Sequence, residues 1–109
     1  MAEQGEQAVS VELSATGITC ELLDGTTRFM GWDELQSVIV KTTDTGPFEE
    51  DVWWILVGNQ GQVTIPQLAS GERELLPRLQ ALPGFDNDAF IEAMSSVENH
   101  QFLCWQREG

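Results

Sequence analysis

Four carboxylates gather in one short stretch near the middle of the sequence. Asp44, Glu49, Glu50 and Asp51 fall within eight residues, around a turn at Gly46-Pro47. Paired carboxylates can act as general acid and base, and calcium prefers carboxylate oxygens as ligands. The ligand spacing of an EF-hand is missing, and nothing in the sequence fixes the distance between two carboxylates. Three interpretations stay open: a solvated loop, a contact surface for a basic partner, and a cation site.

The other side chains that could carry chemistry are the single histidine and the two cysteines. His100 lies in a polar segment without a second histidine or a cysteine at ligand spacing, whereas zinc normally needs four such ligands, or three and a water. Cys20 and Cys104 could join it only through the fold. A cysteine nucleophile needs a neighbour that stabilises the thiolate, and both cysteines lie in apolar, strand-like segments typical of core residues.

No established catalytic or cofactor-binding motif is present. The sequence lacks a Gly-x-Ser-x-Gly elbow, a Walker loop and a dinucleotide-binding fingerprint. We therefore predict that the protein is not an enzyme, and we predict no catalytic residues, no metal site and no cofactor.

Charge gives the strongest global constraint on partners. The chain has 18 acidic and 5 basic residues, a formal net charge of −13. Nucleic acids and anionic membranes are bound through clustered lysine and arginine, which here are scattered singly along the chain. We predict no nucleic-acid and no membrane partner. The acidity either keeps copies soluble and apart or steers the chain toward a basic partner protein.

Composition also predicts compartment and domain organisation. Two cysteines are too few for a disulfide scaffold. Residues 1–7 are polar and acidic without an apolar signal region, and no apolar run approaches the roughly 18–20 residues that span a bilayer. These features predict a cytoplasmic protein with reduced thiols. A chain of 109 residues predicts one domain, over residues 8–109, after a disordered tail at residues 1–7.

Residues 52–57 organise the predicted fold. Six apolar residues in a row, rich in aromatic and β-branched types and closed by Gly58, are typical of a strand. Side chains alternate along a strand, so Trp53 and Trp54 face opposite ways. We expect both faces of this strand to be shielded from solvent.

Hydrophobic alternation predicts five further strands, at residues 9–13, 18–22, 27–30, 36–43 and 62–67. Asp24-Gly25 predicts a type I′ hairpin turn, because both residue types tolerate positive φ. Residues 31–35 break the alternation and predict a corner or single helical turn, with Trp32 and Leu35 inward. Pro66 cannot donate to a ladder, so its strand either lies on an edge or ends there.

The remaining third of the chain has helical spacing. Leucines at helical intervals predict a helix over residues 72–82, with Ser70 as a possible N-cap. Pro77 means that the regular helix either begins near Glu74 or kinks there. A second helix follows from Asp86 or Asn87 to about Ser96, and residues 102–105 then dock as an extended segment. This order predicts an α+β fold: an antiparallel bent sheet or partly open barrel of about six strands, followed by two C-terminal helices.

Several motifs resemble those of a group of short uncharacterised bacterial proteins over residues 9–107. They are Trp32-x-x-Leu35-x-x-Val38, Thr43-Asp44-x-Gly46-Pro47, Asp51-x-x-Trp54-x-Leu56, Leu82-Pro83-Gly84-Phe85-Asp86 and Phe102-x-Cys104-Trp105. This resemblance names no activity.

The first of these motifs also resembles the corner of bacterial pleckstrin-homology-like domains, over residues 9 to about 82. That resemblance implies a bent sheet or barrel closed at one end by a helix. Lipid-binding members carry lysine and arginine in the loop between the first two strands. The corresponding residues here, 14–17, include no base, and two C-terminal helices stand where one is expected.

The function predicted from these features is that of a non-catalytic binding or interaction protein with an acidic surface. Its candidate binding residues are Asp44, Glu49, Glu50, Asp51, Trp53 and Trp54. If the C-terminal elements cover only one face of the sheet, Trp53 or Trp54 lies on an exposed apolar patch through which the chain could form a homo-oligomer. Two alternatives are an immunity-type inhibitor of a basic toxin and a small metal-dependent hydrolase that uses the acidic loop 44–51.

Overall fold

The computed structural model describes residues 6–42, 52–59, 61–67, 69–96 and 99–107. The described strands are β1 (Glu6–Leu13), β2 (Gly17–Leu22), β3 (Thr27–Gly31), β4 (Leu35–Thr42), β5 (Val52–Gly58), β6 (Gly61–Pro66) and β7 (His100–Gln106). The described residues also form two 3₁₀ turns, η1 (Trp32–Glu34) and η2 (Glu72–Glu74), and two helices, α1 (Leu75–Gln80) and α2 (Asn87–Ser95).

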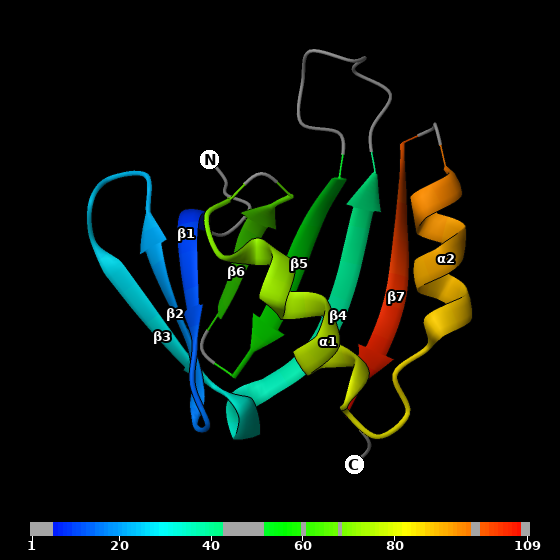
Figure 1. The fold of residues 1–109 in the computed structure, drawn as a ribbon, viewed down its shortest axis with the longest axis horizontal. Coiled ribbons are helices and arrows are strands. Elements are labelled where there is room, and N and C mark those ends of the chain that lie inside the picture. The colour runs from blue at the N-terminus through cyan, green and yellow to red at the C-terminus, as the bar shows by residue number, and fades with distance from the viewer. Residues whose placement is uncertain (1–5, 43–51, 60, 68, 97–98, 108–109) are drawn as a thin grey trace.

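All seven strands belong to one mixed sheet in the order β3-β2-β1-β6-β5-β4-β7 (Figure 1). Neighbouring strands run antiparallel except β1 and β6, which are parallel and pair Gln7 with Thr64. The predicted fold is therefore wrong beyond its α+β class. The sheet is neither purely antiparallel nor six-stranded, and the helices do not end the chain, so the pleckstrin-homology-like architecture is excluded.

The strand count differs because residues 102–105, predicted to dock as an extended segment, are paired into the sheet. This segment is the centre of a full strand, β7, which pairs antiparallel with β4 and places Phe102 opposite Val40. Without β7, the outer backbone groups of β4 would form an unpaired edge. The parallel pair was missed because alternation marks a strand but reveals neither its neighbour nor its direction.

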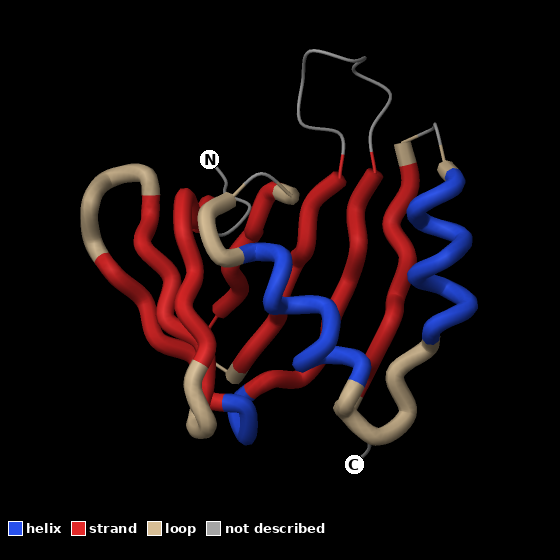
Figure 2. The backbone as a smooth tube through the Cα atoms, in the orientation of Figure 1, coloured by secondary structure: helices blue, strands red, loops and turns tan. Residues whose placement is uncertain are grey.

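The helices lie on one side of the sheet (Figure 2). Helix α1 crosses in front of the central strands, and α2 runs beside β7 at one end of the sheet (Figure 1). The main hydrophobic core fills the space between these helices and the sheet. Its fully buried members include Val38, Val40, Leu56, Val63, Ile65, Leu75 and Leu79.

Several local predictions are confirmed. Residues 32–34 form the expected helical turn, with Trp32 and Leu35 buried. Strand β6 ends at Pro66, and α1 begins at Leu75, so that Pro77 falls in its first turn, where a missing N–H costs little.

Two predicted turn and cap assignments differ. The type I′ turn is wrong, since Gly25 has φ 89° but no described non-glycine residue has positive φ. The Asp24 carboxylate instead accepts hydrogen bonds from the Thr26 amide at 3.0 Å and the Thr26 hydroxyl at 2.6 Å. Ser70 does not cap the helical segment, because Gly71 takes the N-cap position of η2.

Candidate functional site

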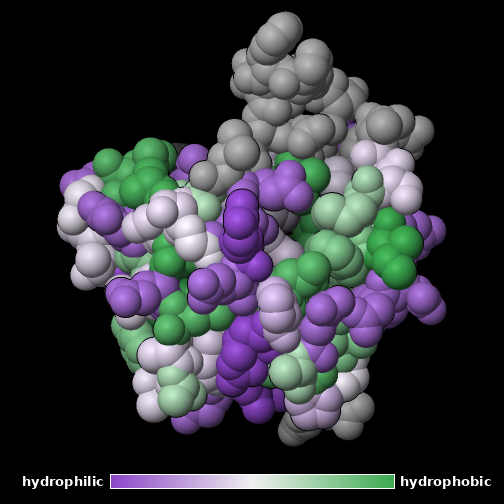
Figure 3. All heavy atoms as spheres, in the orientation of Figure 1, coloured by the Kyte–Doolittle hydropathy of each residue, from purple (hydrophilic) through white to green (hydrophobic). Residues whose placement is uncertain are grey.

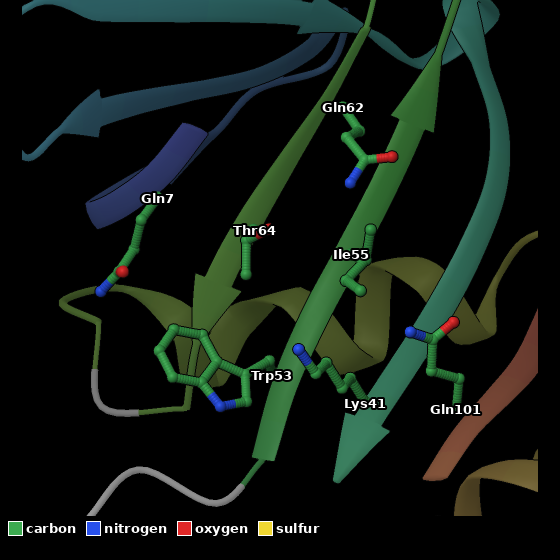
Figure 4. A pocket seen from close by; sticks show the side chains of 7 residues that line it. All are labelled: Gln7, Lys41, Trp53, Ile55, Gln62, Thr64 and Gln101. Atoms are coloured by element: carbon green, nitrogen blue, oxygen red, sulfur yellow. The ribbon is translucent and has the colours of Figure 1, made fainter. Parts of the chain in front are cut away.

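The two faces of β5 have different surroundings. Trp54 faces the helices, where its ring stacks on Phe90 of α2 with centroids 5.6 Å apart and its indole N–H donates to Glu72 of η2. Trp53 and Ile55 face the opposite side of the sheet, and in Figure 4 the helices lie behind the strands that carry them. Of the two faces, only the helix side has a covering layer of described elements.

A pocket of about 420 Å³ lies on the uncovered face. Its size is within the range of roughly 300–1,000 Å³ that is usual for small-molecule sites. Five adjacent strands supply its lining: Gln7 from β1, Gln62 and Thr64 from β6, Trp53 and Ile55 from β5, Lys41 from β4 and Gln101 from β7 (Figure 4).

Strand register brings these side chains together. Ile55 lies opposite Thr64, which lies opposite Gln7 in the parallel pair. One pleat further along the same face, Lys41 lies opposite both Trp53 and Gln101. Directly paired residues share a face of the sheet, so these two rows point into one space. Ile55 forms its floor: it is only 7% exposed, yet it is not part of the core beneath the helices.

Trp53 differs from the other three tryptophans in its hydrogen bonding. The indole N–H groups of Trp32, Trp54 and Trp105 donate to the Ser14 carbonyl at 2.9 Å, to Glu72 at 2.6 Å and to the Pro83 carbonyl at 2.8 Å. Within the described part of the chain, the structure gives the Trp53 indole no acceptor. Tryptophan N–H groups usually find a partner when they leave water. Trp53 is half-buried and lines the pocket.

The lining is polar but carries little charge. Three side-chain amides, one hydroxyl and the ammonium of Lys41, the single lysine of the sequence, stand around Ile55 and the Trp53 ring. The described lining residues include no carboxylate, imidazole or thiol. This set can donate and accept hydrogen bonds but offers no evident acid–base pair.

The structure describes only part of the site predicted from sequence. Asp44, Glu49, Glu50 and Asp51 lie outside the described residues. Trp53 lines the pocket, whereas Trp54 is 2% exposed and belongs to the core on the other face. Neighbours in sequence, the two tryptophans therefore do not form one site.

Sequence reasoning missed most of the pocket. Its polar members alternate with core residues along their strands: Gln62 and Thr64 flank Val63, and Lys41 follows Val40. That alternation could have shown which side chains share a face with Trp53, but only the strand order brings Gln7 and Gln101 to the same place.

The two cysteines do not share a site. Cys20 in β2 and Cys104 in β7 are buried and unpaired, with four strands of the sheet between their own. Burial raises the pKa of Cys20 to about 11, despite the opposing effect of Arg28. Burial and the nearby Asp86 raise the pKa of Cys104 to about 11. Both thiols stay protonated at neutral pH, which argues against a nucleophile.

The described residues contain neither a candidate metal cluster nor a helix that could span a membrane. No three histidine, cysteine, aspartate or glutamate side chains among them are grouped as a metal site would require. None of the helices formed by these residues is long and apolar enough to cross a membrane. No protein-family model, curated protein or solved structure matches the chain.

Proposed function

We propose that the chain is a non-catalytic binding protein whose ligand site is the pocket around Trp53. One observation carries this proposal: Trp53 lines the pocket without a described acceptor for its N–H, whereas the other three indoles donate to protein oxygens. An aromatic wall, an apolar floor and a few convergent polar groups are the usual ingredients of a small-molecule site.

The lining supports binding rather than catalysis. Amides, a hydroxyl and one ammonium can orient a ligand through hydrogen bonds. General acid–base chemistry most often uses histidine or a carboxylate, and the described lining has neither. The two protonated, buried thiols lie in the core instead of the pocket.

A cytoplasmic location forms part of the same proposal. Both cysteines of the chain are unpaired, as is usual for proteins kept in a reducing compartment. The net charge of −13 supports a role that does not involve nucleic acid or anionic lipid, since both would be repelled.

Mapping of ligand contacts by NMR tests the proposed site. A chemically mixed fragment set is added to ¹⁵N-labelled protein, and shifts of the backbone amides are followed. We expect the shifts to concentrate at Trp53, Ile55, Thr64 and Lys41. Filling the pocket with Thr64→Trp should abolish them, because the larger ring occupies the space that the fragments need.

Leu103→Gln is the matched control. Leu103 lies on β7, is 50% exposed and does not line the pocket, so its replacement should leave the shifts unchanged. The amide spectrum of each variant reports whether it is folded. Shifts confined to the helix side, or shifts that persist in a folded Thr64→Trp protein, would contradict the proposal.

A further inference from the structure

We infer that the ligand of this pocket is a neutral, hydroxyl-rich ring, namely a sugar. The inference rests on the proposed function and names the chemical class of the ligand. Three independent features of the pocket support it: its charge, the hydrogen-bonding capacity of its lining and the position of its aromatic wall.

Charge disfavours both kinds of ion. A cationic ligand would meet the ammonium of Lys41 in a pocket whose described lining includes no carboxylate to balance it. An anionic ligand would approach a chain of net charge −13, which repels anions at a distance. A neutral ligand meets neither obstacle, and the Lys41 ammonium can donate to one of its oxygens.

The amides match hydroxyl groups better than other polar groups. Gln7 and Gln101 each present both a donor NH₂ and an acceptor oxygen, and the Thr64 hydroxyl also does both. A sugar hydroxyl likewise donates and accepts, so it can use both halves of an amide. Figure 4 shows Gln7 and Gln101 on opposite sides of the pocket, where each can meet a hydroxyl at the edge of a bound ring.

Trp53 and Ile55 supply the apolar part of the site. Tryptophan combines a broad apolar ring with a single N–H donor at its edge. The C–H bonds of a sugar ring pack against such a surface, while the hydroxyls at the rim reach polar neighbours. The Trp53 N–H, which has no acceptor among the described residues, would then donate to a ring or hydroxyl oxygen.

A panel of oligosaccharides tests this class directly by isothermal titration calorimetry at physiological salt. The neutral members are short oligomers of glucose, mannose, galactose, xylose and N-acetylglucosamine. The charged members are oligogalacturonate, which is anionic, and oligoglucosamine, which is cationic. We expect at least one neutral series to bind and both charged series to bind more weakly or not at all.

Two variants connect binding to the pocket. Trp53→Ala should weaken the neutral sugar by about tenfold or more, since it removes the stacking surface and a hydrogen-bond donor. Gln101→Leu keeps an aliphatic side chain at this exposed position on β7 but removes the amide, and it should weaken binding by roughly threefold. Leu103→Gln again serves as the unaffected control.

The indole N–H resonances provide a readout that does not depend on any variant. Bound sugar should shift the Trp53 indole signal and leave those of Trp32, Trp54 and Trp105, which donate within the protein. Binding of charged oligomers alone, no binding by any series, or neutral binding unchanged in both pocket variants would overturn the sugar assignment. The fragment map would still stand or fall separately, so failure of the ligand class is distinguishable from failure of the site.

Discussion

Trp53 and Trp54 are identical side chains with opposite roles. Alternation along β5 sends Trp54 toward the helices, where stacking on Phe90 and a hydrogen bond to Glu72 satisfy both its ring and its N–H. Trp53 is half-buried on the uncovered face and lines the pocket. The role of each tryptophan therefore depends on which face of the sheet its side chain points to and on whether helices cover that face.

The bond between Trp54 and Glu72 gives a prediction about stability. The Trp54 indole is 2% exposed, so loss of its acceptor would leave a buried N–H unsatisfied. We expect Glu72→Ala to lower the free energy of unfolding by about 1–3 kcal/mol. Glu72→Gln, which keeps an acceptor oxygen, should cost less.

Urea denaturation followed by far-ultraviolet circular dichroism provides the measurement. Glu74→Ala is the matched control, because Glu74 is an exposed residue of the same 3₁₀ turn. Equal losses in the two alanine variants would show that the Trp54 contact contributes nothing specific.

How far the sequence predicts residue positions depends on the kind of information needed. Val38, Val40 and Thr42 share one face of β4, as the alternation of side chains along a strand requires, and all three are buried. The same pattern could not choose between Trp53 and Trp54, since both are apolar and adjacent. That choice required knowledge of where the helices dock.

At the scale of elements, α2 shows how one residue sets a boundary. The Asp86 side chain accepts a hydrogen bond from the Ala89 amide at 3.0 Å, which caps the helix at its N-terminus. The Asp86 backbone amide donates to the Cys104 carbonyl of β7 at 2.7 Å. This residue therefore both starts the helix and holds that start against the edge strand of the sheet.

Removing the cap should destabilise the protein measurably. We expect Asp86→Ala to cost about 1 kcal/mol, since the side-chain acceptor is lost while the backbone bond to β7 remains. Asp86→Ser keeps a capping oxygen and should recover most of that loss. The midpoint of urea denaturation reports both effects, with Asp88→Ala as a control that leaves the cap intact. An Asp86→Ser protein no more stable than Asp86→Ala would show that capping is not the cause.

Element assignment from sequence failed where long-range pairing decides the outcome. The helical turn at residues 32–34 and the start of α1 beside Pro77 follow from local chemistry and were predicted. Strand β7 is defined by its pairing with β4, which is distant in the sequence. The parallel pairing of β1 with β6 likewise joins strands that are distant in the sequence. The pocket depends on both pairings, which is why Gln7 and Gln101 were not predicted.

The two sides of the sheet differ across the whole molecule, because the described helices cover only one of them. The helix side presents hydrophilic and hydrophobic side chains mixed over its surface (Figure 3). The opposite side of the sheet holds the pocket that Figure 4 shows. A net charge of −13 on a molecule measuring 34 × 33 × 27 Å makes self-repulsion a property of the entire fold.

Salt should therefore stabilise the folded chain. At about 10 mM ionic strength the Debye length is about 30 Å, comparable to the molecule, whereas at about 0.15 M it is about 8 Å. Sodium chloride therefore screens the repulsion between carboxylates on opposite sides of the molecule. Each kcal/mol gained in the free energy of unfolding raises Tm by roughly 4–8 °C. We expect scanning calorimetry to show Tm rising by several degrees over this range. The double variant Glu12→Gln/Glu92→Gln, which removes two exposed charges, should begin at a higher Tm and respond less steeply. A Tm that stays constant or falls as salt is added would mean that repulsion between the acidic residues does not destabilise the folded state.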